Sequence, residues 1–172
     1  YDKAIEISPS EANFYVNRGN LKMSINDYSG ALQDLNKALY FNPADTLAYL
    51  NRSYVKSFFK DKQGALDDLN MAIEINSHYA LAYFDRGNLK KEIIDLPGAL
   101  EDYNKTIELN SQFTNAYFGI ALIKTDLNEL QTALQNYDKV LSINPHYSIA
   151  YNNRALIKVS LKDFGGALQD YN

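Results

Sequence analysis

Apolar and small side chains recur along this chain at a fixed interval of 34 residues. One position of the interval is tyrosine every time, in Tyr15, Tyr49, Tyr83, Tyr117 and Tyr151. Another is alanine every time, in Ala31, Ala65, Ala99, Ala133 and Ala167. A leucine and a lysine recur in the same register, and no insertion interrupts it. A period sustained from end to end indicates an array of equivalent structural units.

Polar residues between the apolar runs predict two helices in each unit. An acid precedes every second helix, where it can cap or charge-match the N-terminus: Asp27, Asp61, Asp95, Glu129 and Asp163. An asparagine follows four of the second helices, and we expect each to take the left-handed conformation that closes a helix: Asn42, Asn76, Asn110 and Asn144. The expected helices are 1–8, 12–25, 28–41, 46–59, 62–75, 80–93, 96–109, 114–127, 130–143, 148–161 and 164–172.

The 34-residue period and its conserved spacing resemble the tetratricopeptide repeat (TPR) family over the whole chain. The small-residue slot of the first helix holds Gly19, Ser53, Gly87, Ala121 and Ala155, and the alanines above fill that of the second. Tyr15 and its equivalents stand where the family usually has tryptophan. Lys22 and its equivalents stand where the family has a second aromatic residue, a tyrosine, later in the first helix. The resemblance implies an all-α fold, a right-handed α-solenoid superhelix of antiparallel helix-turn-helix hairpins.

The register predicts one array over residues 1–172. Its complete repeats are 12–45, 46–79, 80–113 and 114–147, preceded by a second helix alone in 1–11 and followed by an incomplete repeat in 148–172. One hairpin cannot bury its apolar face alone, so stability must come from stacking between neighbours. Because neither end carries a polar capping helix, we expect the array to be a fragment of a longer chain.

The repeats can be compared with one another to predict an ion pair. Four repeats combine an arginine of the first helix with an aspartate of the second: Arg18 with Asp34, Arg52 with Asp68, Arg86 with Asp102 and Arg154 with Asp170. In repeat 114–147 both change, to Ile120 and Asn136, while Lys124 remains. We therefore predict that the aspartate pairs with the arginine rather than with the lysine. The same repeat has Thr132 where the others have glycine, through drift or through a specialised contact.

Composition narrows the classes of partner. The formal net charge is −4 without long single-sign blocks, so no nucleic acid is expected. No apolar stretch approaches the roughly 18 residues of a spanning helix, and no signal peptide is recognisable, so no membrane insertion is expected. Cysteine is absent, which excludes disulfides and leaves the compartment open, with the cytoplasm slightly favoured.

Candidate catalytic groups do not converge. His78 and His146 occupy equivalent turns of separate repeats, and no metal-binding, phosphate-binding or nucleophile motif is present. The adjacent acids Asp67 and Asp68 diverge by about 100° around a helix, which favours solvated surface over a metal site. We expect no catalytic residue, metal or cofactor, and no enzyme activity.

The resemblance implies that the first helices line a concave groove that binds a protein or peptide. The candidate groove residues are Asn17, Asn20, Leu47, Leu50, Asn51, Tyr54, Leu81, Phe84, Asp85, Asn88 and Phe118. The apolar ones either anchor a partner or belong to the core between repeats. Asn17, Asn51 and Asn153 share one slot and either bind peptide backbone, as an amide both donates and accepts, or are simply polar surface.

These features predict a protein-protein interaction scaffold. The alternative is a structural spacer or self-assembling array, in which the ends of the chain stack on one another. The carboxylate clamp of co-chaperones within the family would need lysine in place of Val16 and Leu81 and arginine in place of Asp85, and only Asn20 and Asn51 match it. We therefore do not expect binding of acidic chaperone tails.

Overall fold

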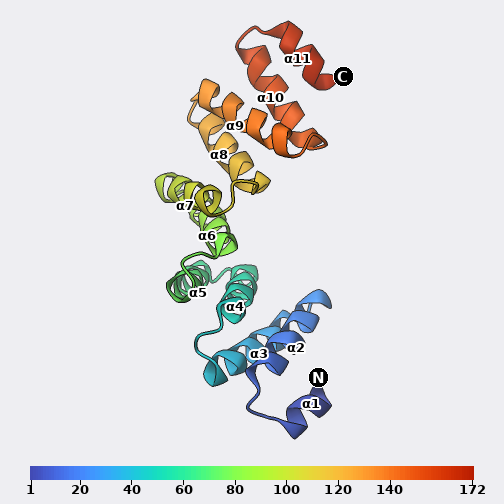
Figure 1. The fold of residues 1–172 in the computed structure, drawn as a ribbon, viewed down its shortest axis with the longest axis vertical. Helices are drawn as coiled ribbons and strands as arrows, with labels where there is room; N and C mark the ends of the chain where they lie inside the picture. The colour runs from blue at the N-terminus through green and yellow to red at the C-terminus, as the bar shows by residue number, and fades with distance from the viewer. The chain divides into compact units, whose positions relative to one another are not determined.

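The computed structural model describes residues 1–172, which form eleven helices joined by short turns (Figure 1). Every helix end predicted from the sequence is confirmed to within one residue. The helices are α1 (Asp2–Ile7), α2 (Ala12–Ser24), α3 (Tyr28–Phe41), α4 (Thr46–Phe58), α5 (Lys62–Ile75), α6 (Ala80–Glu92), α7 (Leu96–Leu109), α8 (Thr114–Asp126), α9 (Leu130–Ile143), α10 (Ser148–Ser160) and α11 (Phe164–Tyr171). The expected all-α fold of helical hairpins is therefore confirmed.

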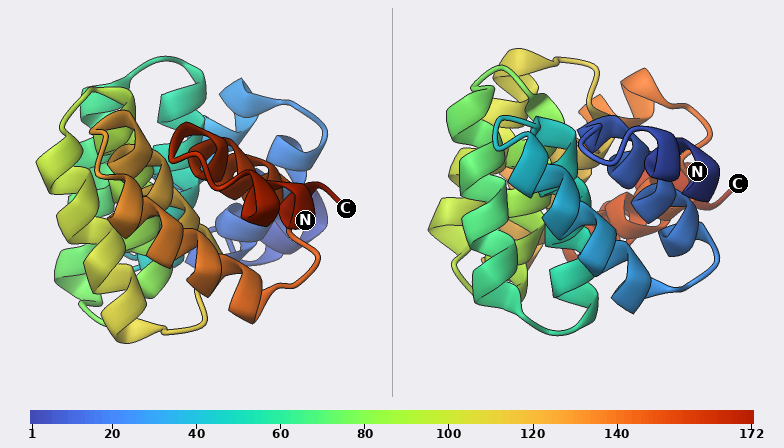
Figure 2. Two further views of the ribbon diagram at one scale, coloured as in Figure 1. Left: turned by 90° about the horizontal axis from the view of Figure 1, so that it is seen from above. Right: turned by 90° about the horizontal axis from the view of Figure 1, so that it is seen from below.

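The chain divides into two units, Tyr1–Leu89 and Lys90–Asn172, which we call unit 1 and unit 2. In unit 1, α2 pairs with α3 and α4 with α5, and α3 also packs against α4. In unit 2, α8 pairs with α9 and α10 with α11, while α7 packs against α8 and α9 against α10. The helices of each pair run antiparallel (Figure 2). In these three contacts between repeats, the second helix of one repeat packs against the first helix of the next.

Small residues bring the two helices of a hairpin together. Ala31, Ala65, Ala99 and Ala133 have no exposed surface, and a Cβ added to Gly19 would lie 3.3 Å from Cγ of Leu35. Tyr103 stands at the position of that leucine in α7, and its ring packs against Gly119 of α8, in the next repeat. A Cβ on Gly119 would lie 2.8 Å from this ring, so the larger side chain of α7 requires a glycine in α8.

Four of the five predicted capping acids accept a hydrogen bond at the start of a second helix. Asp27, Asp61, Asp95 and Asp163 each accept from the backbone N–H of the glycine three residues later, at 2.9–3.0 Å. A Cβ on that glycine would lie 2.2 Å from the carboxylate, so aspartate and glycine are needed together. Glu129 makes no such bond and instead pairs with Lys124 at 2.7 Å. Its repeat is the one with Thr132.

The conformation predicted for the helix-ending asparagines is wrong. Asn42 has φ −132° and ψ 89°, and its equivalents in the other repeats are similar. Their side-chain Oδ1 atoms accept from the N–H two residues later, as Asn42 does from Ala44 at 3.2 Å, so an Asx turn ends these helices. The left-handed residues lie in the turns inside each hairpin: Asn26, Lys60, Ile94, Asn128 and Lys162.

The predicted arginine–aspartate pairs are present at the core of the hairpins. Arg52 donates to both carboxylate oxygens of Asp68, from Nε at 2.9 Å and from Nη2 at 2.7 Å. Arg18 with Asp34 and Arg154 with Asp170 repeat this geometry. Since Arg86 and Asp102 fall in different units, the fourth pair stays a prediction.

The expectation that lysine leaves the aspartate alone is wrong. Nζ of Lys56 lies 2.9 Å from Oδ2 of Asp68, and the equivalent lysines reach their aspartates at 2.8–2.9 Å. In the repeat that lacks the aspartate, Lys124 pairs with Glu129 instead. Burial raises the pKa of Asp34, but hydrogen bonds from Arg18 and Lys22 outweigh it and hold this pKa below its ordinary value.

The same arginines also bind the preceding repeat. Nη1 of Arg52 donates to Oδ1 of Asn36 in α3 at 2.8 Å, and Arg86 reaches Asn70 of α5 at the same distance. Arg154 reaches Asp138 of α9 at 2.6 Å. One guanidinium therefore fixes both the hairpin and its stacking on its neighbour.

Candidate protein-binding surface

Three of the predicted groove residues are large side chains that stand exposed on the first helices of unit 1. Leu47 of α4 is 46% exposed, Tyr54 of α4 is 59% exposed and Leu81 of α6 is 38% exposed. We call the surface formed by α2, α4 and the unit 1 part of α6 the first-helix face. These three side chains contribute little to the core, so they are free to contact another molecule.

For Leu50, the structure favours the alternative of a core residue over that of a groove anchor. Leu50 is 5% exposed and packs in the buried cluster of unit 1, together with its equivalent one repeat earlier, Val16. The positions equivalent to Leu47 are exposed in every repeat, whereas those of Leu50 are buried in the first two repeats and half-buried in the next two. The two leucines share one side of α4, and only stacking between repeats separates their roles.

Phe84 and Phe118 have an intermediate place. Both are half-buried, and Phe118 packs its ring against Tyr137, with centroids 5.9 Å apart, and against Tyr147, at 5.1 Å. Phe118 belongs to unit 2 and is therefore not part of the first-helix face. The predicted apolar residues therefore differ in burial: some are exposed, one is buried in the core, and these two lie in between.

Amides line the first-helix face beside the exposed apolar groups. Nδ2 of Asn51 donates to Oδ1 of Asn20 at 2.6 Å, which links α4 to α2. Asn17 is exposed and Asn88 is half-buried. The Asn20–Asn51 pair leaves the Oδ1 acceptor of Asn51 and the amide donors of Asn20 available, which suits an incoming peptide group.

Asp85 occupies the slot that holds Asn17 and Asn51 in the preceding repeats. It is half-buried and forms no ion pair, and burial raises the pKa of its carboxyl to about 6. At neutral pH it therefore places an uncompensated negative charge on the first-helix face. A Lys or Arg side chain would complement this charge.

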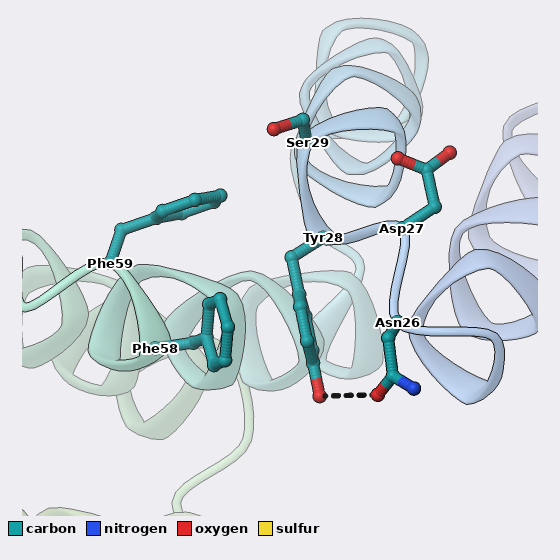
Figure 3. Close-up of a pocket in the computed structure, with 6 residues that line it drawn as sticks. All are labelled: Asn26, Asp27, Tyr28, Ser29, Phe58 and Phe59. Carbon is teal, nitrogen blue, oxygen red and sulfur yellow. Dashed lines mark hydrogen bonds between the residues drawn. The ribbon is translucent and has the colours of Figure 1, made fainter.

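Aromatic side chains that sequence reasoning missed extend this surface at the start of α3 and the end of α4. They surround a cavity of about 320 Å³ lined by Asn26, Asp27, Tyr28, Ser29, Phe58 and Phe59. Figure 3 shows the ring of Tyr28 lying against that of Phe58. The two ring centroids are 3.8 Å apart, and the Tyr28 hydroxyl donates a hydrogen bond to Oδ1 of Asn26 at 3.4 Å. The sequence did contain a signal for this aromatic group, because Phe58 stands where the other repeats have polar residues: Ser24, Glu92, Asp126 and Ser160. Phe58 is 56% exposed.

Unit 2 contains a second cavity, of about 240 Å³, between α8, α9 and α10. Its lining residues are Leu122, Thr125, Asp126, Leu130, Tyr137, Asn153, Leu156, Ile157 and Ser160. Burial raises the pKa of Tyr137 and the charge of Asp126 adds to this effect, while hydrogen bonds with Thr125 and Asn153 oppose it. We call this space the α8–α10 cavity. Among its lining residues, Asn153 belongs to the asparagine slot that the sequence offered for binding peptide backbone.

The two histidines lie exposed in turns, as predicted. The backbone N–H of His78 and that of His146 each donate to the asparagine two residues earlier, at 3.1 Å. No three acidic, histidine or cysteine side chains lie together in a way that could hold a metal ion. None of the helices has the length and apolar character needed to cross a membrane.

Comparison with known proteins confirms the resemblance stated above. The sequence model of the tetratricopeptide repeat matches residues 12–45 and 114–147. Comparison with curated protein sequences gives no match.

Solved structures share the fold over nearly the whole chain. The MamA protein is 22% identical, with 94% of this chain and 92% of that chain covered and a TM-score of 0.82. YrrB, described as a TPR protein with an unusual peptide-binding site, is 24% identical, with 98% and 87% covered and a TM-score of 0.79. PilF of Pseudomonas aeruginosa is 16% identical, with 94% and 73% covered and a TM-score of 0.86. At these identities the likeness establishes the fold.

Proposed function

Since this chain is an array of tetratricopeptide repeats, we propose that it is a protein-interaction scaffold and binds a segment of a partner protein on the first-helix face of unit 1. The observation that carries the proposal is the exposure of Leu47, Tyr54 and Leu81 on that face. The fold is in general a non-catalytic scaffold for protein interactions. YrrB, which shares it, is described as having a peptide-binding site.

The exposed groups are suited to a partner segment in both energy and geometry. Covering the exposed part of Leu47 or Leu81 would contribute on the order of 1 kcal/mol each. Tyrosine is among the residues that dominate binding energy in protein interfaces, and the ring of Tyr54 lies 6.4 Å from that of Tyr28, which stacks on Phe58. The apolar contacts provide affinity, and the amides of Asn20 and Asn51 orient the backbone of the segment.

The charge of the face favours a partner with basic residues. Asp85 is the acid on this face without a counter-ion, whereas Arg18 and Arg52 are already engaged by buried aspartates. A cation of the partner that approached Asp85 would regain the electrostatic stabilisation that burial removed. This complementarity also agrees with the lack of a carboxylate clamp.

A capture experiment with matched variants tests the proposed face. The double variant Leu47→Ser, Tyr54→Ser removes its apolar groups, and Tyr40→Ser, Met71→Ser removes exposed apolar groups from the second helices α3 and α5. We expect wild type and the second variant to capture the same protein from a lysate, and the first variant to lose it. Loss in both variants, or in neither, would contradict the proposal. Circular dichroism confirms that each variant is folded.

A further inference from the structure

The α8–α10 cavity occupies the place that an aromatic pair fills in unit 1. At a spacing of 102 residues, which is three repeats, Leu130 corresponds to Tyr28, Leu156 to Tyr54 and Ser160 to Phe58. In unit 1 the rings of Tyr28 and Phe58 stack with centroids 3.8 Å apart. In unit 2 leucine and serine cannot fill the same space, and the cavity remains.

The shape and lining of this cavity suit one side chain of a partner. Tyr137 and Ile157, which are 0% and 3% exposed, are its most buried lining residues, and Leu122, Leu130 and Leu156 add apolar surface. Its volume of about 240 Å³ is below the roughly 300–1,000 Å³ of small-molecule sites. A single ring inserted from a protein segment matches both the size and the apolar character.

The charge beside the cavity is negative and has no counter-ion. Asp126 ends α8, is exposed and forms no ion pair. The nearest lysines along α8 and α10 are held elsewhere, since Lys124 pairs with Glu129 at 2.7 Å and Lys158 with Asp170 at 2.8 Å. The residue next to an inserted ring would therefore meet a carboxylate, which selects a basic neighbour.

We propose that the α8–α10 cavity binds an aromatic side chain of a partner protein segment, with an adjacent Lys or Arg of that segment pairing with Asp126. The inserted ring takes the position that Phe58 has in unit 1. This inference rests on the proposed function in that the ligand is a protein segment, but it concerns unit 2 and names the chemistry that is recognised. Partner aromatic side chains in buried pockets are typical anchors of interfaces.

The test uses the whole chain labelled with ¹⁵N and the end-blocked hexapeptide Gly-Ser-Phe-Arg-Ser-Gly as the probe. We expect the peptide to shift amide signals in the last turns of α8 and α10. Replacing its Phe by Ala should abolish the shifts. Replacing its Arg by Glu should weaken binding at least about threefold, the range of an exposed ion pair. Asp126→Asn should weaken binding of the Phe-Arg peptide to a similar degree.

The structure supplies a variant that closes the cavity and a matched control. Ser160→Phe introduces the ring that unit 1 carries at the same position, and we expect it to abolish the shifts. Ser160→Ala keeps the space open and should bind as wild type does. If Ser160→Phe proves unfolded, the double variant Leu130→Tyr, Ser160→Phe recreates the complete Tyr28–Phe58 pair and takes its place.

Other results separate this inference from the proposed function. Shifts confined to α2, α4 and α6 and unchanged by Ser160→Phe would overturn the cavity proposal and leave the first-helix face in place. The peptide could also cause no shifts at all while capture of a partner still depends on Leu47 and Tyr54. This result too would overturn the cavity proposal and leave the first-helix face in place. If Ser160→Phe instead removed a concentration-dependent dimer formed without peptide, the occupant would be a second copy and the proposal would be wrong.

Discussion

Asp85 breaks the repeat pattern of its slot by placing a charge on the surface. The slot it fills holds asparagine in the two preceding repeats, and asparagine there needs no counter-ion. A half-buried carboxylate without a partner costs stability, because burial disfavours its charged form. We interpret this cost as the consequence of a binding role for the charge.

Substitution of Asp85 should increase stability at neutral pH. The native pKa of about 6 lies above the ordinary 3.8, so the native state keeps a proton between these values that the unfolded chain has released. Stability therefore falls as the pH rises through this window. We expect Asp85→Asn to raise the free energy of unfolding at pH 7 by about 1–2 kcal/mol, after allowance for partial exposure, and to leave it nearly unchanged at pH 4.

Urea unfolding at pH 4, 5.5 and 7 measures this effect. Glu101→Gln is the control, because Glu101 is an exposed acid of α7 and should show no comparable gain. A gain for Asp85→Asn that is equal at all three pH values would refute the assignment of the effect to titration of Asp85.

The buried aspartates give a second prediction at the residue scale. The Asp68 side chain is 3% exposed and bound by both Arg52 and Lys56. Asp68→Asn alone leaves these cations without their acceptor and should lower the free energy of unfolding by about 3 kcal/mol. The double variant Arg52→Ile, Asp68→Asn copies Ile120 and Asn136 and should lose clearly less than the sum of the two single changes. Additive losses in urea unfolding would contradict the coupling.

At the scale of the helix, the aspartate cap and its glycine act as one device. The added Cβ of a Gly64→Ala variant would lie 2.2 Å from the Asp61 carboxylate. The lost cap costs about 1 kcal/mol and offsets the gain of about 1 kcal/mol that alanine brings over glycine in a helix, so we expect Gly64→Ala not to raise the free energy of unfolding. Gly165→Ala in α11 is the control, since nothing lies within 4 Å of its Cβ and it should show the gain of alanine over glycine. A stabilising Gly64→Ala would disprove the coupling.

Helix positions could be predicted because their determinants are local and repeated. Apolar spacing, capping acids and the 34-residue register all mark the same boundaries. The error at Asn42 arose because asparagine suits both a left-handed cap and an Asx turn, and the sequence does not distinguish them. The left-handed positions carry residues as different as Asn26, Lys60 and Ile94, and no glycine, so residue type gave no signal there.

The candidate surface could be predicted only in part. Asn51, Leu47 and Tyr54 follow from their place on the first helix, but the burial of Leu50 depends on the stacking of neighbouring hairpins. The α8–α10 cavity depends on what is missing, namely a ring at Ser160. Comparing the residue types at one position across the repeats would have indicated the cavity, because Phe58 and Ser160 differ greatly in size. Looking for residues that the repeats share does not reveal it.

At the scale of the whole chain, arginine and lysine side chains serve mainly to hold the array together. Each hairpin arginine described here also binds the repeat before it, so most cations of the first helices are engaged in structure. Asp85 in unit 1 and Asp126 in unit 2 each lie beside apolar surface without a counter-ion. The formal net charge of −4 agrees with a preference for basic partners.

The measurement that tests the central claim most directly is the affinity of the captured partner for wild type and the two double variants. We predict that Leu47→Ser, Tyr54→Ser raises the dissociation constant at least about tenfold, equivalent to about 1.4 kcal/mol. Tyr40→Ser, Met71→Ser should leave it unchanged. Equal dissociation constants for all three proteins would contradict binding at the first-helix face.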